Sequence, residues 1–537
     1  MKEPFIHIRR AGGGFVLKGL TNCALGHKIR NPARTDVDGI FVEWSWDGSC
    51  LKVRNDRYGF YPVYYFSNAD EIAISTSIWR LLESGACRDL DYKGLAAFLY
   101  LGSFLGEDTP FRAIKALPPN ATLEWRNGRL RVSGQIAIPK MQTPSRDDAI
   151  DSYISLFRAS IARRLPNKPT VAVPLSGGRD SRHIALELCR QGIRPDFCFT
   201  ADFYPGILVA NETQAASLLC QALGIDHVMI KQTKSRVSAE TRKNQITGFT
   251  AGVCEHSWVL AIRDYLAQSP CAMYDGIGGD VLSESRSLSK QRLEWCDKGN
   301  YGELGRDLLN CVDDRMIKGL LSREMAGRLN RDIAFERFEE EFLRHKNAPN
   351  PVGSFQFWNR ARRHVALAPY ALLGSIHDVH SPYLDNDLFD YLASLPTSML
   401  VDRAFHTETI HRAFPAVSHI PWGGLEKGGR SYHRQYRDFA LDTLFYLSRN
   451  KSKAWMRRSF IIPRLTRCLF DMSYSPQTHW IGTMSVFFAQ LEDVARGELA
   501  PENGLFDLKF KEFKKPGNKK SAVRARAQGA SLSLTGD

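Results

Sequence analysis

The sequence predicts an α/β protein with a β-rich N-terminal part, a second part built on a helix-covered parallel sheet, and a helical C-terminal part. Three observations support this prediction. Residues 39–66 alternate aromatic and β-branched residues with polar ones around the turn WDGS, which is typical of an antiparallel hairpin. From residue 171 onward, short apolar runs alternate with helical patterns. Two of those runs end in glycine-rich loops.

The composition is that of a globular protein with several domains. The 537 residues are 43% hydrophobic and 11% aromatic, enough for about two to four domains. No apolar stretch is long enough for a membrane span, and the first residues lack the apolar core of a signal peptide, so we expect a cytoplasmic protein. The eleven cysteines include no C-x-x-C pair, so we expect free, reduced thiols.

The positive charge is concentrated near the end of the sequence. A net charge of +14 could indicate a nucleic acid, anionic lipid or acidic substrate as partner. Much of the excess lies in the basic tail at residues 509–537, which has few large apolar residues and is expected to be solvated and disordered. Binding of a polyanion or acidic partner by this tail is the alternative, but a nucleic-acid or membrane partner is not what we expect for the protein.

Composition and pattern also predict the domain boundaries. The β-rich pattern ends in a proline-containing linker, and a helix then starts at Ser145, a credible N-cap, and runs to about Arg164. We therefore expect a β-rich domain at residues 1–142, an α/β domain at 145–430, a helical extension at 431–508, and the tail.

The stretch VAVPLSGGRDSRHIALELC, residues 171–189, predicts a buried strand, a tight turn and a helix that runs to Gly192. The backbone N–H groups of the turn then lie at a helix N-terminus, where they attract an anion such as phosphate. The turn offers Asp180 as a hard oxygen ligand for Mg²⁺ bound with a polyphosphate. It contains no Walker motif, because no lysine follows the glycines, and no G-x-G-x-x-G fingerprint. The alternative is an ordinary turn in which Ser and Asp cap the helix. The residues of this predicted anion site are Ser176, Gly177, Gly178, Asp180 and Ser181.

A second glycine-rich loop follows a later strand. The pattern predicts strands at 196–201, 227–231 and 271–275, with helices at 211–223 and about 256–267. The strand at 271–275 ends in GIGGD. The carboxyl ends of parallel strands meet at one edge of a sheet, so we expect Asp180 and Asp280 to converge on one Mg²⁺ polyphosphate. Without its partner, GIGGD would be an ordinary turn.

The string SGGRDS resembles the pyrophosphate loop of the ATP pyrophosphatases, which cleave ATP between its α and β phosphates to activate a carboxylate or carbonyl. Within that group, the asparagine synthetase family is similar over most of the chain. The tRNA-modifying relatives share the loop but not the β-rich N-terminal half. The segments that carry the resemblance to asparagine synthetases are NDRYGFYPVYY (55–65), TPFRAIKALPP (109–119), ANETQAASLLCQALGIDH (210–227), DGIGGDV (275–281) and SPYLDNDLFDYLASLP (381–396).

This resemblance implies a fold, two cofactors and residue roles. The N-terminal domain would be a degenerate, Ntn-hydrolase-like glutamine amidotransferase domain, and the second an ATP-pyrophosphatase domain of the adenine nucleotide α-hydrolase type. ATP and Mg²⁺ would be the cofactors. The loop at 176–181 would surround the pyrophosphate, Asp180 and Asp280 would hold Mg²⁺, and Lys427 would stabilise charge during catalysis. The further nucleotide-binding residues would be Leu175, Thr200, Asp275 and Gly276.

Two departures from the family pattern narrow the expected activity. Family members that hydrolyse glutamine use a cysteine at position 2, where this sequence has Lys2, and the NGE substrate segment is missing, so we expect no glutaminase activity. The family's glutamate after the strand at 271–275 is Ile277 here, and the following acid is Val281. An alkyl side chain cannot do the work of a carboxylate, so asparagine production is in doubt and a specialised acceptor fits better.

The segment SIHDVHS contains His377, Asp378 and His380. Two histidines at this spacing could share a metal, but no third ligand is evident in the sequence. We therefore expect a structural role, with Asp378 at the position where the family has a glutamate that orders the floor of the active site.

Three functions follow from these observations. The first is an AMP-forming amide ligase acting on a specialised substrate with a carboxylate and an amine. A lasso-peptide cyclase, with a precursor peptide and a maturation protease as partners, is one version. The second is an ammonia-dependent asparagine synthetase, and the third is an inactive scaffold that retains the fold.

Overall fold

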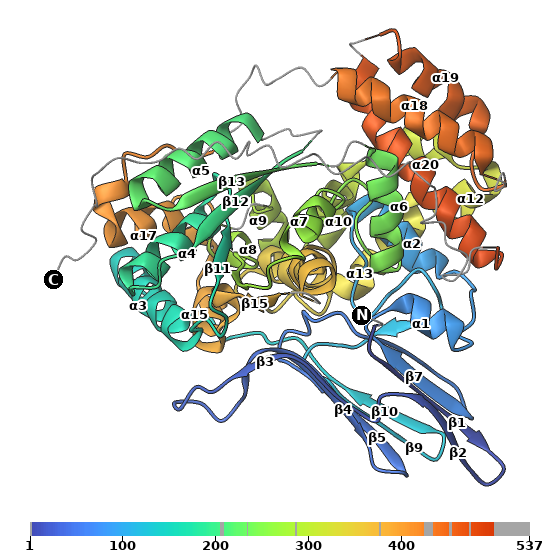
Figure 1. Ribbon diagram of the computed structural model, residues 1–537, viewed down its shortest axis with the longest axis horizontal. Helices are drawn as coiled ribbons and strands as arrows, with labels where there is room; N and C mark the ends of the chain where they lie inside the picture. The colour runs from blue at the N-terminus through green and yellow to red at the C-terminus, as the bar shows by residue number, and fades with distance from the viewer. Residues whose placement is uncertain are drawn as a thin grey trace.

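The computed structural model describes residues 3–203, 209–232, 235–284, 287–374, 377–423, 433–450, 454–471 and 474–498. Within these ranges there are two antiparallel sheets near the N-terminus, one parallel sheet, and a group of helices toward the C-terminus (Figure 1). This is the mixed α/β architecture that the sequence predicts. None of the described helices combines the length and apolar content needed to cross a membrane. The basic tail lies outside the described residues.

The N-terminal part contains two antiparallel sheets with the strand orders β2-β1-β7-β6-β8 and β10-β9-β5-β4-β3. The predicted hairpin is confirmed: β4 and β5 pair with Trp46 opposite Leu51, and the Asp47 carboxylate accepts hydrogen bonds from the N–H groups of Ser49 and Cys50. Alternate residues of both sheets form one apolar cluster. The elements are β1 (Phe5–Ala11), β2 (Gly14–Gly19), β3 (Asn22–Ile29), β4 (Asp38–Trp46), β5 (Cys50–Asn55), β6 (Tyr64–Ser67), β7 (Glu71–Ser75), α1 (Ile78–Glu83), α2 (Tyr92–Leu101), β8 (Lys115–Ala116), β9 (Thr122–Arg126) and β10 (Arg129–Ser133).

The second part is built on a parallel sheet with the order β13-β12-β11-β14-β15. The chain enters at the central strand β11, runs outward to β13, and then returns to the other side of β11 at β14. Such a reversal of strand order leaves a crevice at the carboxyl ends of the two central strands. The four strands predicted between residues 171 and 275 are present, each displaced by no more than one residue. The strands are β11 (Val171–Pro174), β12 (Phe197–Asp202), β13 (Asp226–Lys231), β14 (Ala272–Tyr274) and β15 (Asp378–His380).

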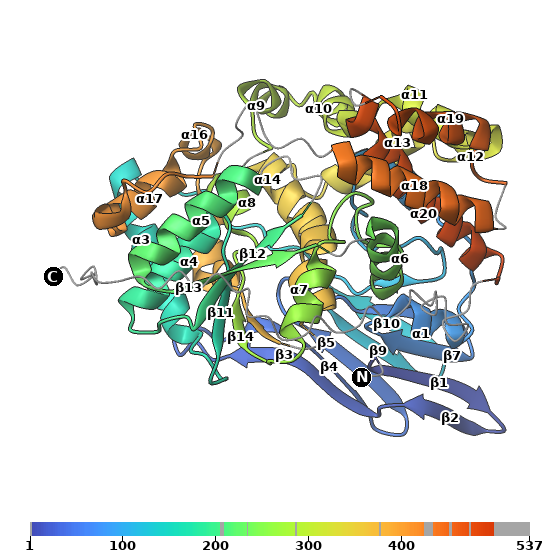
Figure 2. The same cartoon turned by 45° about the horizontal axis from the view of Figure 1, so that its top comes forward.

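Helices cover this sheet on both faces (Figure 2). The predicted helix after Ser145 is confirmed, and the Ser145 hydroxyl caps it by accepting the N–H of Asp148. The helix predicted from about His256 instead begins at Val259, because His256 has a φ of 68°, which a right-handed helix does not allow. The helices are α3 (Arg146–Arg163), α4 (Arg179–Arg190), α5 (Val209–Leu223), α6 (Arg236–Thr247), α7 (Val259–Leu266) and α8 (Gly279–Ser283).

A long helical region links β14 to β15 and continues beyond it. It includes two consecutive π-helices, η2 and η3. The elements are α9 (Lys290–Asp297), α10 (Tyr301–Leu308), η1 (Leu309–Cys311), α11 (Asp314–Leu320), α12 (Arg323–Arg328), α13 (Arg331–Phe342), α14 (Pro351–Phe355), η2 (Gln356–Val365), η3 (Leu367–Leu373), η4 (Pro382–Leu384), α15 (Asn386–Ser394), α16 (Thr397–Leu400), α17 (Phe405–Ala413) and η5 (Pro415–Val417).

The C-terminal helices share a core with the N-terminal part. These helices are α18 (His433–Arg449), α19 (Arg458–Cys468) and α20 (Ser475–Ala495). Phe98 of α2 stacks on Phe487 of α20, with ring centroids 5.4 Å apart. The same hydrophobic cluster includes Phe338 of α13. The predicted helical extension therefore packs on the beginning of the chain as well as on the middle (Figure 1).

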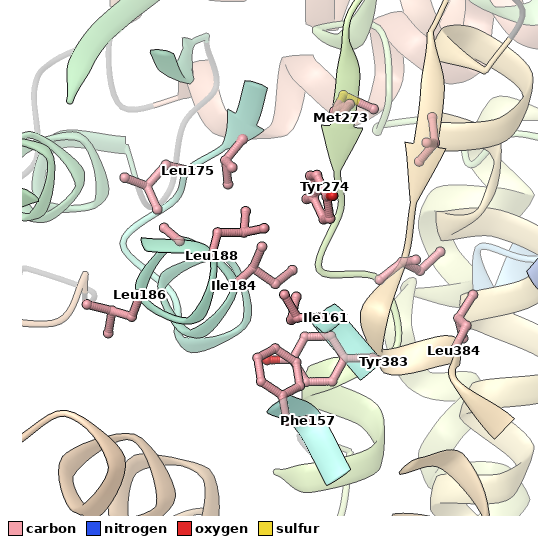
Figure 3. Packing of buried hydrophobic residues seen from close by; sticks show 14 of the residues in the cluster. Phe157, Ile161, Leu175, Ile184, Leu186, Leu188, Met273, Tyr274, Tyr383 and Leu384 are labelled. Atoms are coloured by element: carbon pink, nitrogen blue, oxygen red, sulfur yellow. The ribbon is translucent and has the colours of Figure 1, made fainter. Parts of the chain in front are cut away.

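The core beneath the two glycine-rich loops is apolar and aromatic. Figure 3 shows Phe157 of α3, Ile184 of α4 and Tyr274 of β14 in this packing, with Tyr383 beside Phe157. The Phe157 and Tyr383 rings lie 4.9 Å apart, and both are fully buried. This packing fixes α4 against the ends of β11 and β14, which are the elements that carry the loops.

A buried ionic network joins the N-terminal sheets to the α/β part. The guanidinium of Arg164 donates to Asp385 at 2.7 Å and to both oxygens of Asp38 at 2.9 and 3.0 Å. All three side chains are almost completely buried. Arg163 also donates to Asp385, and the Tyr274 hydroxyl donates to the carbonyl of Arg164. A strand of the N-terminal part, the end of α3, the N-cap of α15 and β14 are thus tied to one residue, Arg164, through its side chain and its backbone carbonyl.

Replacing Arg164 by Met should destabilise the protein by about 3–5 kcal/mol, because it leaves Asp38 buried without its counter-ion and leaves Asp385 with Arg163 alone. The exposed pairs of Arg412 with Asp147 and Asp151 provide the control, and R412M should cost at most about 1 kcal/mol. Urea denaturation of both variants measures the difference. The interpretation would be wrong if R164M were no less stable than R412M, and we expect R164M/D38N/D385N to recover most of the loss.

Candidate active site

The two glycine-rich loops lie side by side at the carboxyl ends of β11 and β14, where the strand order reverses. The loop after β11 leads into α4, with Gly178 as N-cap residue and Asp180 in the first helical turn. The loop after β14 leads into α8, with Asp280 in its first turn. The backbone N–H of Asp280 donates to Oδ2 of Asp180 at 3.1 Å. The two aspartates that the sequence singles out are therefore neighbours.

Glycines make this close approach possible. A Cβ atom on Gly276 would lie 2.8 Å from Cβ of Asp180, and one on Gly279 would lie 2.5 Å from its Oδ1. Gly278 has a φ of 92°, which favours glycine. The spacing of glycines in GIGGD is therefore explained by contact with Asp180 as well as by the turn itself.

The two carboxylates differ in their surroundings. Asp180 is partly buried and receives the Asp280 N–H. The Asp280 side chain is partly exposed and, among the described residues, forms no hydrogen bond or ion pair. Its oxygens are therefore available to a ligand. Oxygen donors from two carboxylates suit a hard cation such as Mg²⁺.

The loop between β11 and α4 is held by its own hydroxyl groups. Ser181 Oγ accepts the N–H of Ser176 at 3.1 Å and lies 3.2 Å from Ser176 Oγ, which accepts the N–H of Gly178. Ser176 is exposed, whereas Ser181 is buried. The two predicted hydroxyls are thus close together at the start of α4, and the Ser176 hydroxyl is open to a ligand from solvent.

Thr200 and Leu175 meet at the ends of the neighbouring strands. The Thr200 hydroxyl donates to the carbonyl of Leu175 at 2.5 Å and lies 2.7 Å from Nε2 of His227. The Leu175 N–H continues the sheet by donating to Phe199. Both predicted residues are buried, so a ligand could touch only the small exposed part of either residue.

Asp275 occupies a partly buried position at the end of β14. Its Oδ1 accepts the N–H of Ile277 at 2.9 Å. Burial raises the pKa of Asp275 to about 6, and this hydrogen bond partly opposes the shift. Ile277 itself is buried in the core cluster and does not face solvent.

The segment that precedes Lys427 packs directly on the first loop. The N–H of Gly423 donates to the carbonyl of Gly177 at 2.8 Å, and the guanidinium of Arg182 lies over the Trp422 ring at 3.9 Å. Arg182 also donates to the carbonyl of Pro421. Lys427 lies outside the described residues. The sequence did not single out Arg182 or Trp422, although both stand within or next to quoted motifs.

The histidines of the SIHDVHS segment do not assemble a metal site among the described residues. His377 Nδ1 lies 3.3 Å from the backbone nitrogen of Cys271, and the His380 ring stacks on Tyr274 and has the tilted ring of His27 beside it. Asp378 lies 3.5 Å from the Lys168 ammonium group. The structural role of this segment stays a prediction.

A different group, Glu255, His256 and His364, has ligand atoms within 4.8 Å of one another. Nδ1 of His364 accepts the N–H of Gly252 at 2.9 Å, so the proton of the neutral ring lies on Nε2, which faces Glu255 at 2.6 Å. A metal-binding histidine needs the opposite arrangement, with the proton on the nitrogen away from the metal. We therefore interpret this group as a hydrogen-bonded pair beside a buried histidine.

Comparison with known proteins identifies one domain. Residues 26–134 match the family model of the glutamine amidotransferase domain. The match covers most of the two antiparallel sheets together with α1 and α2. The chain therefore has an amidotransferase-type N-terminal domain, consistent with an asparagine synthetase-like protein. No curated protein matches the chain.

Adding a methyl group at Gly279 should displace the Asp180 carboxylate and cost about 1–3 kcal/mol of stability, because the new Cβ would overlap Oδ1. Gly327 provides a matched control, since its Cβ would meet no atom within 4 Å. We expect G327A to be neutral or stabilising. Denaturation by urea compares the two variants, and equal stabilities would contradict the close packing of the loops.

The partly buried Asp275 predicts a specific pH dependence. The folded pKa of about 6 lies above the unfolded value of about 3.9, so ionisation destabilises the folded protein as the pH rises from about 4 to about 6. D275N removes this loss. Its stability relative to the unsubstituted protein should be up to about 3 kcal/mol more favourable at pH 7.5 than at pH 4. A difference that does not change with pH would contradict the raised pKa.

Proposed function

We propose that the protein is an ATP-dependent amide ligase of the asparagine synthetase type, with a degenerate Ntn-hydrolase-like domain followed by an ATP-pyrophosphatase domain. It would release AMP and diphosphate. The observation that carries this proposal is the meeting of Asp180 and Asp280. They come from helices that follow glycine-rich loops on the two central strands, at the point where α/β sheets bind their ligands.

ATP and Mg²⁺ are the cofactors that we propose. The residues fit the cation, because the backbone of Asp280 contacts the Asp180 carboxylate and the Asp280 side chain has no partner among the described residues. Asp180 and Asp280 would hold it. When bound, Mg²⁺ supplies positive charge that stabilises the charge developing on the phosphates.

The protein groups would bind and orient the reactants. The backbone N–H groups at the start of α4 and the Ser176 hydroxyl would bind the departing pyrophosphate. Leu175 and Thr200 would border the adenine, and Gly276 would allow the nucleotide to approach the backbone. Lys427 would stabilise charge. It follows Gly423 by four residues in the sequence, and Gly423 contacts the loop between β11 and α4.

The acceptor would be a specialised substrate, of which a peptide that cyclises is one version. Ile277 is buried, and Val281 borders a small cavity. Apolar side chains line much of that cavity, among them Leu282, Phe357, Trp358 and Leu400. Neither Ile277 nor Val281 offers a carboxylate that could bind the amino group of an aspartate substrate. An acyl adenylate of the substrate would be attacked by an amine held close to it, with positioning as the main contribution of the protein.

We also propose that the N-terminal domain does not hydrolyse glutamine. The family nucleophile is an N-terminal cysteine whose own α-amine acts as base. Cys23 instead lies within β3, where its nitrogen is an amide, and burial raises the pKa of its thiol. A less ionised thiol without a neighbouring amine is a poor nucleophile.

The experiment is to measure binding of Mg-ATP and release of AMP and pyrophosphate with amino acids and peptides that carry a free carboxylate and an amine. D180N should weaken Mg-ATP binding by about 100-fold, because it removes a metal ligand. D264N is the control, since Asp264 of α7 forms an exposed pair with Arg242 of α6, and it should behave like the unsubstituted protein.

Equal nucleotide affinity in D180N and the unsubstituted protein would contradict the ligase and favour a scaffold. Formation of ADP in place of AMP would contradict the proposed chemistry. Product formation from aspartate and ammonia would identify an asparagine synthetase, and activity with glutamine alone would overturn the loss of glutaminase function.

A further inference from the structure

His406 lies directly behind Asp180, in the first turn of α17, and has no solvent exposure. Its Nδ1 is 3.4 Å from Oδ1 of Asp180 and 2.9 Å from Oγ of Ser283. Its Nε2 is 3.2 Å from the Tyr153 hydroxyl and 3.3 Å from the Tyr383 hydroxyl. Burial lowers the pKa of His406 well below its ordinary value, so the ring is neutral.

The hydrogen-bond network determines which nitrogen carries the proton. Ser283 donates its own hydroxyl hydrogen to the carbonyl of Gly279 at 2.7 Å, so it can only accept from His406. The carboxylates of Asp180 and Glu284 also face Nδ1, at 3.4 and 4.0 Å. All three contacts place the proton on Nδ1.

The opposite edge of the ring is held by donors. With its proton on Nδ1, His406 presents a lone pair at Nε2, and the Tyr153 hydroxyl can donate to it. His183 Nδ1 also lies 3.2 Å away. Tyr153 and His183 are themselves buried among aromatic rings. The ring of His406 is thereby fixed, with its N–H donated to Ser283 and the same nitrogen facing Asp180.

The Asp180 carboxylate has an N–H group beside each oxygen, hydrogen-bonded to Oδ2 at 3.1 Å and within 3.4 Å of Oδ1. The Asp280 N–H donates to Oδ2, and the His406 N–H faces Oδ1. A carboxylate held in this way keeps one orientation and can still offer its remaining lone pairs to a cation. Groups in this position commonly change metal affinity by about 10- to 100-fold.

We propose that His406 is a positioning residue that orients Asp180 for the magnesium nucleotide. This proposal rests on the proposed function and extends it to a residue outside every motif in the sequence. The competing interpretation is a buried histidine that only fills and stabilises the core. The two differ because positioning requires a donor at the Nδ1 end of the ring, whereas core filling does not.

Two substitutions separate these roles. In H406N the amide nitrogen takes the place of Nδ1 and keeps a donor near Asp180. H406Q places its amide near the Nε2 end and leaves no donor toward Asp180. H345Q removes another fully buried histidine, which contacts Ser354 and Asn359 in a different core, and controls for loss of stability alone.

The probe is Mn²⁺ with α,β-methylene-ATP, whose binding is measured by calorimetry and by electron paramagnetic resonance of the metal. Thermal unfolding of each ligand-free variant is recorded alongside. We expect H406Q to weaken binding by about 10- to 100-fold, H406N by no more than about 3-fold, and H345Q not at all, even where H345Q lowers the melting temperature as much as H406Q does.

The proposal fails if H406Q binds the metal–nucleotide pair as tightly as the unsubstituted protein while D180N does not. It also fails if H406N and H406Q lose affinity equally, because the donor would then be irrelevant. Equal binding by D180N and the unsubstituted protein would overturn the proposed function itself, and with it the role of His406.

Discussion

One buried guanidinium, that of Arg164, joins the N-terminal sheets to the α/β part of this protein. It compensates Asp38 of the N-terminal sheets and Asp385 at the start of α15, and the backbone carbonyl of Arg164 accepts a hydrogen bond from the hydroxyl of Tyr274 on β14. Buried charges are tolerated only when they are paired in this way. The strand that carries the second glycine-rich loop is therefore anchored to the same residue that attaches the amidotransferase-type domain.

The candidate site depends on the order of strands in the parallel sheet. Because β11 and β14 are neighbours although they are about a hundred residues apart in sequence, two loops that look unrelated in the sequence become one surface. Glycine backbone from the later loop then packs on the aspartate of the earlier one. A glycine-rich loop followed by an aspartate is common in proteins. The site arises because two such loops lie together at one edge of the sheet.

Much of this could be predicted from the sequence because the signals are periodic or local. The hairpin at WDGS, the strands between residues 171 and 275, and the capped helix after Ser145 follow from alternation, apolar runs and capping residues. The adjacency of Asp180 and Asp280 follows from the rule for parallel strand ends. The predicted start of the helix near His256 was wrong, because the positive φ of this residue cannot be recognised from the hydrophobic periodicity of the sequence. His406 could not be found, since it reaches Asp180 from more than two hundred residues away and belongs to no motif.

The core shared by α2 and α20 bears on how the protein is made. One apolar cluster includes Tyr64 and Phe98 from the beginning of the chain and Phe487 and Val494 from near its end. During synthesis α2 emerges from the ribosome long before α20, against which it packs. Until α20 has been translated, the apolar face of α2 remains without its final cover, so the nascent chain would depend on chaperones or on rapid elongation at this stage.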